Sequence, residues 1–382
     1  MTHALRGKTA CVGVATAGVG MAPGRNAMEL MAEAVHGALD DAGIPLSEVD
    51  GLFAATAFHS MAAMSLAEHL GIQPSFSDGS NIGGSSFMAH ALVAAMALEM
   101  GICNVAVIAY GSNQRTAGGF KSISEPMPFE AIYGPRNPLT AYALATARYM
   151  HQYGATREDF AHVAVSARKW AQRNPEACER DDLTIDDVLA ARMISDPLGK
   201  LDCCLVTDGA AAIVMTRADR AKDTAQTPIH LLGCAMEHHH RMISAMPDLT
   251  ETAAAKSGPR AFEMAGMKPS DMDTVQVYDA FTINTVLFLE DLGYCAKGEG
   301  HSFVRDGRIA PGGELPVNTN GGGLSCVHPG MYGLFVTAEA IRQLRGGCGE
   351  RQVPDAKLSV AHGNGGVLSS QVTAIWGRPE TV

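Results

Sequence analysis

The sequence predicts an α/β protein made of two related halves, and three observations support this prediction. In 382 residues there are 41 glycines, and hydrophobic residues make up 47%, which suits buried parallel strands joined by tight turns. The segments 38–50 and 261–273 resemble each other. A glycine-rich turn that leads into a helix follows each of them. We therefore expect two packed units, residues 1–225 and 226–382.

The first expected element is a strand near the N-terminus. Residues 1–18 contain a short apolar run followed by glycines and polar residues, which favours a strand over a secretion signal. Cysteines occur without a CxxC pair or a regular framework, as expected of reduced thiols. These features predict a cytoplasmic protein.

Each repeat predicts the same local structure. An amphipathic helix ends at an Ala-Gly pair, a serine opens a short turn, and an aspartate (Asp50 or Asp273) precedes an apolar strand. Chance similarity is the alternative, because such short patterns are common. The shared spacing over the whole segment favours duplication.

The helix expected after the first glycine-rich turn, residues 87–100, is apolar almost all round. This pattern predicts a helix buried between layers. The apolar stretch 87–111 carries His90, Glu99 and Asn104 and is interrupted by Gly101. We expect a helix and a strand here and no membrane span, because those polar groups are costly in lipid.

Residues from about 117 to 201 have a different character and are predicted to form an inserted lobe. They concentrate prolines, aromatic residues and much of the mid-chain charge. Strand-like patterning returns at 203–215, where Asp208-Gly209 predicts a tight turn between two apolar runs.

The C-terminal third carries a specific resemblance. Asn320-Gly-Gly-Gly-Leu-Ser-Cys-Val-His328-Pro-Gly is similar to the thiolase signature, in which an Asn-Gly-Gly run precedes Gly-His-Pro. Other stretches agree in order and spacing with the sterol carrier protein X type of thiolase: Tyr278-Asp-Ala-Phe281, His362-Gly-Asn-Gly-Gly366, 193–197 and 208–212.

The resemblance covers nearly the whole chain and implies the thiolase fold. That fold is a duplicated five-layer α-β-α-β-α arrangement, and the lobe at about 117–201 would cover its site. The resemblance also implies a homodimer and an acyl-CoA substrate. Coenzyme A would then enter as part of the substrate, with no bound cofactor.

Thiolases use a cysteine nucleophile at the start of the buried first-half helix, where the helix dipole lowers the pKa of a thiol. In this sequence that place is Gly83-Gly84-Ser85-Ser86, without cysteine. Ser85 is a candidate replacement nucleophile if a base lies beside it, and Ser86 is a candidate substrate-binding residue. Alternatively, both serines cap the helix. Cys103, the nearest thiol, is expected to be a packed core residue.

His328 is the strongest candidate for catalysis, since the resemblance implies that it polarises the thioester oxygen. The alternative is a buried core histidine. Cys326 is expected to point away from the site. His362 stands where thiolases carry a second cysteine, and an imidazole is a competent acid or base there.

The glycine-rich runs around these histidines predict space for the thioester. We expect His328, His362 and Tyr278 to lie around that space, at the mouth of the helix that starts at Ser85. Candidate substrate-binding residues are Asn320, Gly322, Asn364 and Gly365, although Asn364 is explained equally well by a turn.

Tyr278 departs from the thiolase pattern, which has Asn or His at this position. A phenol can accept a proton from a 3-hydroxyl group, as retro-aldol cleavage of a 3-hydroxyacyl-CoA requires, and that step needs no acyl-enzyme. Thiolase-like aldolases of steroid side-chain degradation share both features and work with a small zinc-ribbon and OB-fold partner protein. They lose the His328-Pro329 motif, however, and their second tyrosine would fall near Val327.

Three functions follow from these residues. The favoured one is retro-aldol cleavage of a 3-hydroxyacyl-CoA, or the reverse bond formation. The alternatives are thiolytic acyl transfer with another nucleophile and a non-catalytic acyl-CoA-binding, lipid-binding or scaffold subunit. The net charge of −11 disfavours nucleic acid as a partner. No metal site is predicted, because the consecutive histidines 238–240 cannot all face one ion.

Overall fold

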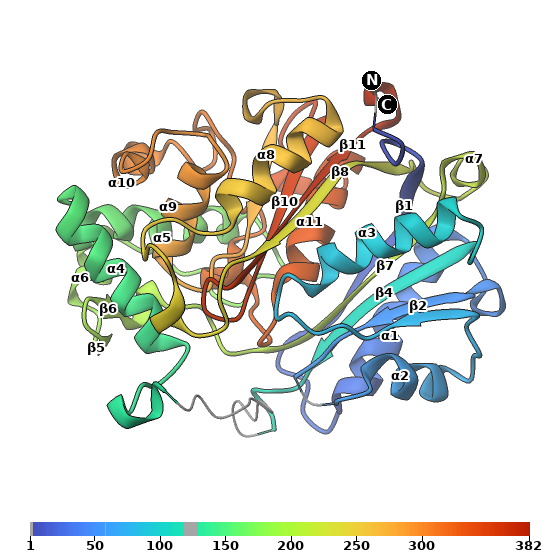
Figure 1. Ribbon diagram of the computed structural model, residues 1–382, viewed down its shortest axis with the longest axis horizontal. Helices are drawn as coiled ribbons and strands as arrows, with labels where there is room; N and C mark the ends of the chain where they lie inside the picture. Colours follow the sequence, from blue (N-terminus) through green and yellow to red (C-terminus); the bar gives the residue numbers. More distant parts are fainter. Residues whose placement is uncertain (1–2, 58, 118–128) are drawn as a thin grey trace.

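A computed structural model describes residues 3–57, 59–117 and 129–382 (Figure 1). The strands of its main sheet are β1 (Thr9–Gly20), β2 (Gly51–Ala54), β3 (Phe76–Asp78), β4 (Val105–Ser112), β7 (Asp208–Arg217), β8 (Ile229–His238), β9 (Thr274–Val277), β10 (Leu358–Gly365) and β11 (Ser370–Gly377). They lie side by side in the order β3-β2-β4-β7-β1-β8-β11-β10-β9.

The two halves of this sheet repeat one topology. The first half reads β3-β2-β4-β7-β1. The second reads Val317, β9, β10, β11, β8, where Val317 makes a parallel bridge to Val275 in the place of a third strand. The halves join where β1 pairs with β8 through Ala10 and Cys11. The predicted duplication is confirmed, while the boundary at 225/226 stays a prediction.

The repeated aspartates Asp50 and Asp273 make equivalent hydrogen bonds in the two halves. Helix α1 (Ala27–Ala42) and helix α8 (Ala254–Ala265) each end at a left-handed glycine, as expected. The Asp50 carboxylate accepts a hydrogen bond from the Val105 N–H at the start of β4, at 2.8 Å. Asp273 accepts from the Leu358 N–H at the start of β10, at 2.9 Å. Each aspartate thus ties its repeat to a neighbouring parallel strand.

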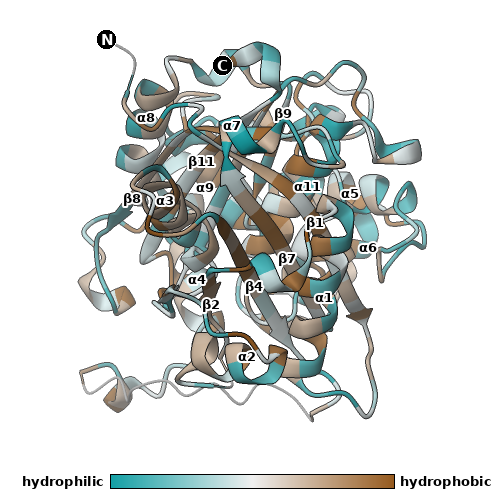
Figure 2. Ribbon diagram, turned by 90° about the vertical axis from the view of Figure 1, so that its right-hand side faces the viewer, coloured by the Kyte–Doolittle hydropathy of each residue, from teal (hydrophilic) through white to brown (hydrophobic). Residues whose placement is uncertain are grey.

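Helices complete the predicted five layers. Helix α3 (Ser86–Glu99) contacts strands of both halves and lies with α11 (Gly333–Arg345) in the central layer. Helices α1 and α2 (Ala62–Leu70) cover the outer face of the first half, and α8 covers that of the second. Figure 2 shows the hydrophobic strands β4 and β7 enclosed between helices.

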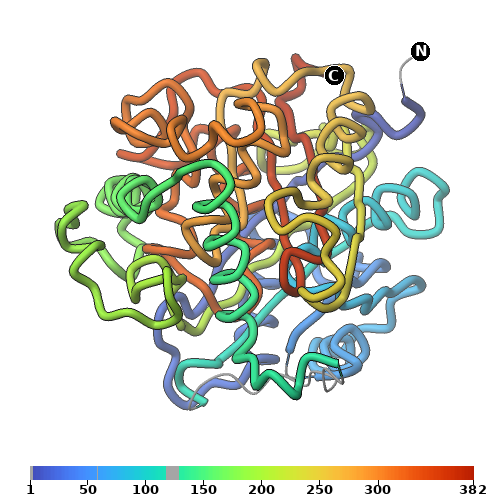
Figure 3. Tube along the Cα trace, turned by 60° about the vertical axis from the view of Figure 1, so that its left-hand side comes forward, coloured from blue at the N-terminus to red at the C-terminus, as the bar shows by residue number. Residues whose placement is uncertain are grey.

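The inserted lobe is confirmed for its described part. It contains α4 (Leu139–Tyr153), α5 (Arg157–Gln172), α6 (Ile185–Ala190) and a hairpin of β5 (Met193–Ser195) and β6 (Leu198–Gly199); residues 118–128 lie outside the described residues. Two second-half helices, α9 (Thr282–Asp291) and α10 (Gly300–Phe303), pack against it (Figure 3). Buried Glu290 on α9 accepts a hydrogen bond from Tyr149 on α4. The lobe is therefore anchored to the second half.

One expectation was wrong. Asp208-Gly209 is not a turn between two strands, because Asp208 is the first residue of β7. Its buried carboxylate instead accepts hydrogen bonds from the Ala22 and Arg115 N–H groups, both at 2.9 Å. Helix α7 (Ala218–Ala221) then precedes β8. No helix within the described ranges is long and apolar enough to cross a membrane.

Candidate active site

Tyr278 and His328 form the centre of the candidate site. The phenolic oxygen of Tyr278 lies 3.1 Å from His328 Nε2, and the two rings meet edge to face at 87°. Tyr278 directly follows β9, and ligands of open α/β sheets bind beyond the carboxyl ends of parallel strands. Both side chains are buried, with exposures of 5% and 7%.

The Tyr278 ring lies against the turn that precedes α3. A Cβ at Gly84 would lie 2.0 Å from Tyr278 Cε2, so the phenol occupies the space that a side chain at 84 would need. Tyr278 N–H also donates to the His362 carbonyl at 3.0 Å, which fixes its backbone against β10. The prediction that Tyr278 lies at the start of this helix is confirmed.

Burial keeps both groups of the pair neutral. It lowers the pKa of His328 to about 4 and raises the pKa of Tyr278 well above its usual value. The His328 backbone is held by Thr207 Oγ1 at its N–H, at 3.0 Å, and by Gln114 Nε2 at its carbonyl, also at 3.0 Å. A neutral imidazole nitrogen held at this distance can accept the phenolic proton.

Tyr332 and Asn320 support this pair. The Tyr332 ring is stacked near His328 at 28° and meets Tyr278 edge to face at 76°. Its hydroxyl donates to Asn320 Oδ1 at 2.8 Å, and the same oxygen accepts the Gly322 N–H at 2.8 Å. The Asn320 oxygen is thus engaged within the protein; a direct role in substrate binding stays a prediction.

A buried carboxyl group explains why residue 322 is a glycine. A Cβ at Gly322 would lie 1.9 Å from Asp279 Oδ2, and Asp279 Oδ1 accepts the Gly323 N–H at 2.6 Å. Burial raises the pKa of Asp279 to about 7. The glycine run therefore wraps around Asp279, whose role is not evident from the sequence although it follows Tyr278 directly. Substrate binding by Gly322 stays a prediction.

The two serines bond within the turn before α3. Ser85 Oγ lies 3.0 Å from the Ile82 carbonyl and 2.8 Å from Ser370 Oγ. Ser86 Oγ accepts the Ile82 N–H at 2.9 Å and donates to the Gly83 carbonyl at 2.6 Å. Among the hydrogen bonds of the described residues, none joins Ser85 to a base. These contacts are structural, but the expected helix cap is wrong in its detail: Ser85 stands at the N-cap position of α3 without a side-chain cap hydrogen bond, and both hydroxyls bond to the preceding turn or to Ser370 instead.

His362 lies apart from the Tyr278–His328 pair. Its Nδ1 is 2.9 Å from Thr373 Oγ1, its Nε2 is 2.9 Å from Gln371 Oε1, and burial lowers its pKa to about 3. A Cβ at the next residue, Gly363, would meet Ser85 Cα at 2.9 Å. Because side chains alternate along a strand, His362 faces away from α3. Our expectation that it joins the pair at this helix therefore fails.

Asn364 and Gly365 belong to different surroundings. Asn364 shares the His362 side of β10, where its Nδ2 donates to Tyr142 Oη at 2.7 Å and its Oδ1 accepts from Gln371 Nε2 at 2.8 Å. A Cβ at Gly365 would lie 1.7 Å from the Ile82 carbonyl oxygen, so β10 can approach the turn before α3 only with glycine there.

Tyr142 is a further residue of the site that could not be identified from the sequence. This residue comes from α4 of the lobe, and its ring stacks on Phe281 with centroids 4.3 Å apart. Position 142 lies in an ordinary helical pattern, so nothing local in the sequence indicates a site residue. It joins the site only through the tertiary packing of the lobe.

The cysteines show no sign of a thiolate near this site. Cys326 is buried, and its Sγ faces Asn174 Nδ2 at 3.5 Å. Burial raises the pKa of Cys103 to about 11, and its Sγ packs against Gly51, as a core residue would. In the part of the chain that the structure describes, no three His, Cys, Asp or Glu side chains gather as a metal site would require.

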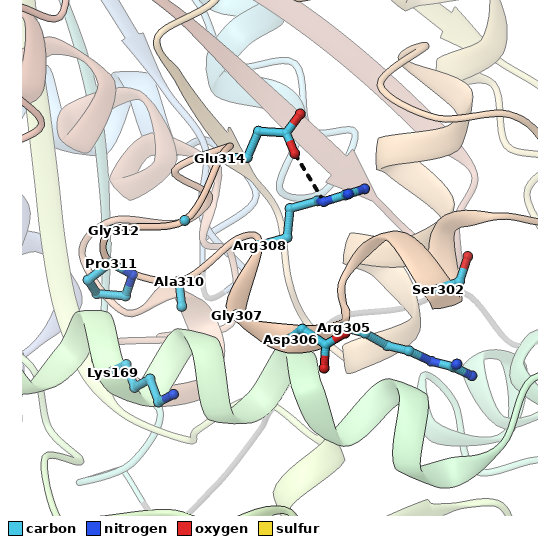
Figure 4. A pocket seen from close by; sticks show the side chains of 11 residues that line it. Lys169, Ser302, Arg305, Asp306, Gly307, Arg308, Ala310, Pro311, Gly312 and Glu314 are labelled. Atoms are coloured by element: carbon cyan, nitrogen blue, oxygen red, sulfur yellow. Dashed lines mark ion pairs between the residues drawn. The ribbon is translucent and has the colours of Figure 1, made fainter.

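A surface cavity of about 540 Å³ lies elsewhere, between α5 and the segment 302–314 (Figure 4). Its cationic residues are Lys169, Arg305 and Arg308. Arg308 pairs with Glu314 at 3.1 Å and Arg305 pairs with Asp159. Neither Tyr278 nor His328 lines this cavity, so it is distinct from the candidate active site.

Comparison with known proteins agrees with this geometry. A family described as "Thiolase C-terminal domain-like" matches residues 235–378. The 17-hydroxy-3-oxo-4-pregnene-20-carboxyl-CoA lyase of Mycobacterium tuberculosis is 36% identical over 360 residues, which cover 90% of this chain and 92% of the relative. The chain belongs to the thiolase superfamily. Within it, the chain is of the sterol carrier protein 2 thiolase-like type.

Other relatives define the chemical class of this thiolase-superfamily member. An acetyl-CoA acetyltransferase of Methanothermobacter thermautotrophicus is 33% identical over 373 residues, covering 92% of this chain and 94% of the relative. The solved structure of an Ltp2-ChsH2(DUF35) aldolase superposes with a TM-score of 0.90 at 33% identity, covering 98% of each chain. This superfamily member is an acyl-CoA enzyme, a lyase or an acyltransferase.

Proposed function

We propose that this enzyme cleaves the C2–C3 bond of a 3-hydroxyacyl-CoA by a retro-aldol reaction, with Tyr278 as the proton acceptor. The observation that carries the proposal is the 3.1 Å contact between Tyr278 and His328 beside a helix start that lacks cysteine. The lyase from Mycobacterium tuberculosis and the Ltp2-ChsH2(DUF35) aldolase support the reaction class.

The proton moves along the pair. As the 3-hydroxyl loses its proton to Tyr278, the phenolic proton passes to neutral His328. The C2–C3 bond breaks, a carbonyl forms at C3, and the electron pair moves to C2 and the thioester oxygen as an enolate. Return of the proton to C2 gives a shorter acyl-CoA, so no covalent intermediate is needed.

Thiolytic acyl transfer has weaker support. It requires an activated nucleophile, and the Ser85 hydroxyl bonds to Ile82 and Ser370 rather than to a base. The lowered pKa of His328 disfavours a lasting ion pair between an imidazolium and a thiolate.

The test is a product analysis with two panels of thioesters. The full chain is incubated with 3-hydroxyacyl-CoA esters alone and with 3-oxoacyl-CoA esters plus free CoA, and products are identified by mass spectrometry. We expect a ketone or aldehyde plus a shorter acyl-CoA from the first panel. Cleavage confined to the second panel, or no reaction in either panel, would contradict the proposal.

We also propose a partner for this enzyme. The related aldolase structure holds Ltp2 together with ChsH2(DUF35), so a small zinc-ribbon and OB-fold protein of that kind is the expected partner. Each panel is therefore run with and without a co-expressed protein of this type from the same host. The homodimer stays a prediction that light scattering would check.

A further inference from the structure

A chain of hydrogen bonds between buried side chains runs along β10 and β11 towards the lobe. His362 Nδ1 lies 2.9 Å from Thr373 Oγ1, and His362 Nε2 lies 2.9 Å from Gln371 Oε1. Gln371 Nε2 donates to Asn364 Oδ1 at 2.8 Å, and Asn364 Nδ2 donates to Tyr142 Oη at 2.7 Å. This hydrogen-bond chain ends at the Tyr142 phenol.

The amides set the direction of this chain. Because Gln371 presents Nε2 to Asn364, its Oε1 must accept, and His362 Nε2 therefore carries the ring proton. Nδ1 then accepts from the Thr373 hydroxyl. The low pKa of His362, about 3, keeps this ring neutral at physiological pH. Every donor thus points towards the Tyr142 oxygen.

Two hydrogen-bond donors at the Tyr142 end of this hydrogen-bond chain lack good acceptors. The acceptor within reach of the Tyr142 hydroxyl among the described residues is the Gly366 carbonyl at 3.5 Å, the outer limit of a hydrogen bond. Beside it, Asn284 is fully buried. Its Oδ1 accepts the Phe281 N–H at 3.1 Å, whereas its Nδ2 makes no hydrogen bond of standard geometry among the described residues.

Both donors belong to the neighbourhood of Tyr278. Tyr142 stacks on Phe281, three residues after Tyr278, and its phenol contributes to the raised pKa of Tyr278. Asn284 faces Tyr142 closely enough to act on its phenol as a hydrogen-bond donor and so lower its pKa, which engages one of the two N–H groups on Asn284 Nδ2 and leaves the other for a ligand. Buried donors without good acceptors are costly unless a ligand satisfies them.

We propose that Tyr142 and Asn284 donate hydrogen bonds to the thioester oxygen of the acyl-CoA, and that His362, Gln371 and Asn364 are positioning residues for Tyr142. This inference rests on the proposed function. Negative charge develops on that oxygen as the C2–C3 electron pair becomes an enolate. Tyr278 and His328 are occupied with the 3-hydroxyl proton, so the enolate oxygen needs other donors.

The first test is Tyr142→Phe in the full chain, assayed for 3-hydroxyacyl-CoA cleavage. We expect kcat to fall by about 30- to 100-fold while KM changes by less than about threefold, because the bond strengthens in the transition state. Tyr149→Phe is the matched control, since it removes a hydroxyl from the same helix where that hydroxyl binds Glu290. The control should lower Tm and leave kcat unchanged. Wild-type kcat in Tyr142→Phe would overturn the inference.

The positioning role has its own test in a double-mutant cycle. If His362 acts through Tyr142, then His362→Gln lowers kcat by about tenfold, and adding Tyr142→Phe gives a double variant no slower than Tyr142→Phe alone. Independent, multiplying losses would overturn the positioning role.

A binding measurement separates this inference from the proposed function. Tyrosines labelled with ¹³C at Cζ are followed by NMR in the wild-type chain as acetyl-CoA is added until the Tyr278 signal stops shifting. The Tyr142 signal should shift in parallel. A stationary Tyr142 signal would overturn the inference even if the wild type cleaves its substrate. A moving signal without any cleavage would overturn the proposed function alone.

Discussion

Two buried histidines in similar sequence surroundings have different neighbours. His328 and His362 both lie in glycine-rich stretches of the second half, and burial lowers the pKa of both. His328 presents one ring nitrogen to the ionisable phenol of Tyr278. Both nitrogens of His362 instead face neutral hydroxyl and amide groups. The first environment suits proton transfer, and the second suits the fixing of an orientation.

A motif therefore does not determine the role of its histidine. A neutral imidazole acts as a base only when a proton donor lies at its free nitrogen. On β10 the alternation of side chains turns His362 away from α3, although its carbonyl still accepts the Tyr278 N–H.

The largest effect is expected for Tyr278→Phe. Loss of the proton acceptor should lower kcat for 3-hydroxyacyl-CoA cleavage by about 10³-fold, with folding retained. Tyr294→Phe is the matched control, because it removes a hydroxyl that has no partner among the described residues. Steady-state kinetics and circular dichroism check both variants. Retention of more than about a tenth of wild-type kcat would remove Tyr278 from the reaction.

The pH dependence of the reaction rate should reflect the lowered pKa of His328. His328 must be neutral to accept a proton, and its pKa is lowered to about 4 while that of Tyr278 is raised. The titration of His328 should therefore appear as a fall in rate as the pH drops through about 4. Measurement of kcat/KM against pH checks it, and the Asp279→Asn variant removes the separate titration of the neighbouring carboxyl, whose pKa is about 7. A fall centred near 6.5 in that variant would show that the pKa of His328 is not lowered.

A smaller effect is expected for the other histidine. His362→Gln should lower kcat by about tenfold and leave the shape of the pH–rate profile unchanged, because His362 does not titrate above about pH 4. In the wild type, its depressed pKa adds stability that is present above pH 6.5 and is lost as the pH falls towards 3. Thermal unfolding of the variant should show less of this loss, and an altered pH–rate profile would instead assign His362 to proton transfer.

The smallest effect is expected for Ser85→Ala. The hydroxyl bonds within the turn and to Ser370, so its removal should cost about 1 kcal/mol of stability and change kcat by less than about threefold. Differential scanning fluorimetry and the cleavage assay measure the two quantities. A loss of activity of 100-fold or more would revive Ser85 as a nucleophile.

The fold could be predicted well because its signals are local and repeated. Local sequence patterns identify the helix ends at Gly43 and Gly266 and the aspartates at 50 and 273. In the structure, the members of each pair have equivalent roles. The turn expected at Asp208-Gly209 failed because the carboxylate satisfies distant backbone groups, which no local pattern reveals.

The site could be predicted only in part. Tyr278 and His328 were found because they stand in recognisable motifs, and the structure brings them together. Tyr142 and Asn284 were missed because their significance arises from the packing of α4 and α9. His362 was misplaced because the strand register of β10, not its motif, decides which face it occupies.

The close approach of Gly84 to Tyr278 constrains how this lineage can change. Any side chain at position 84 would collide with the phenol ring, whose Cε2 lies 2.0 Å from the position of the missing Cβ. A mutation that installs any side chain at residue 84, a thiol included, is therefore deleterious until residue 278 shrinks, and a shrunken residue 278 has lost the phenol. The two positions are thus coupled: a side chain at residue 84 and a phenol at residue 278 exclude each other.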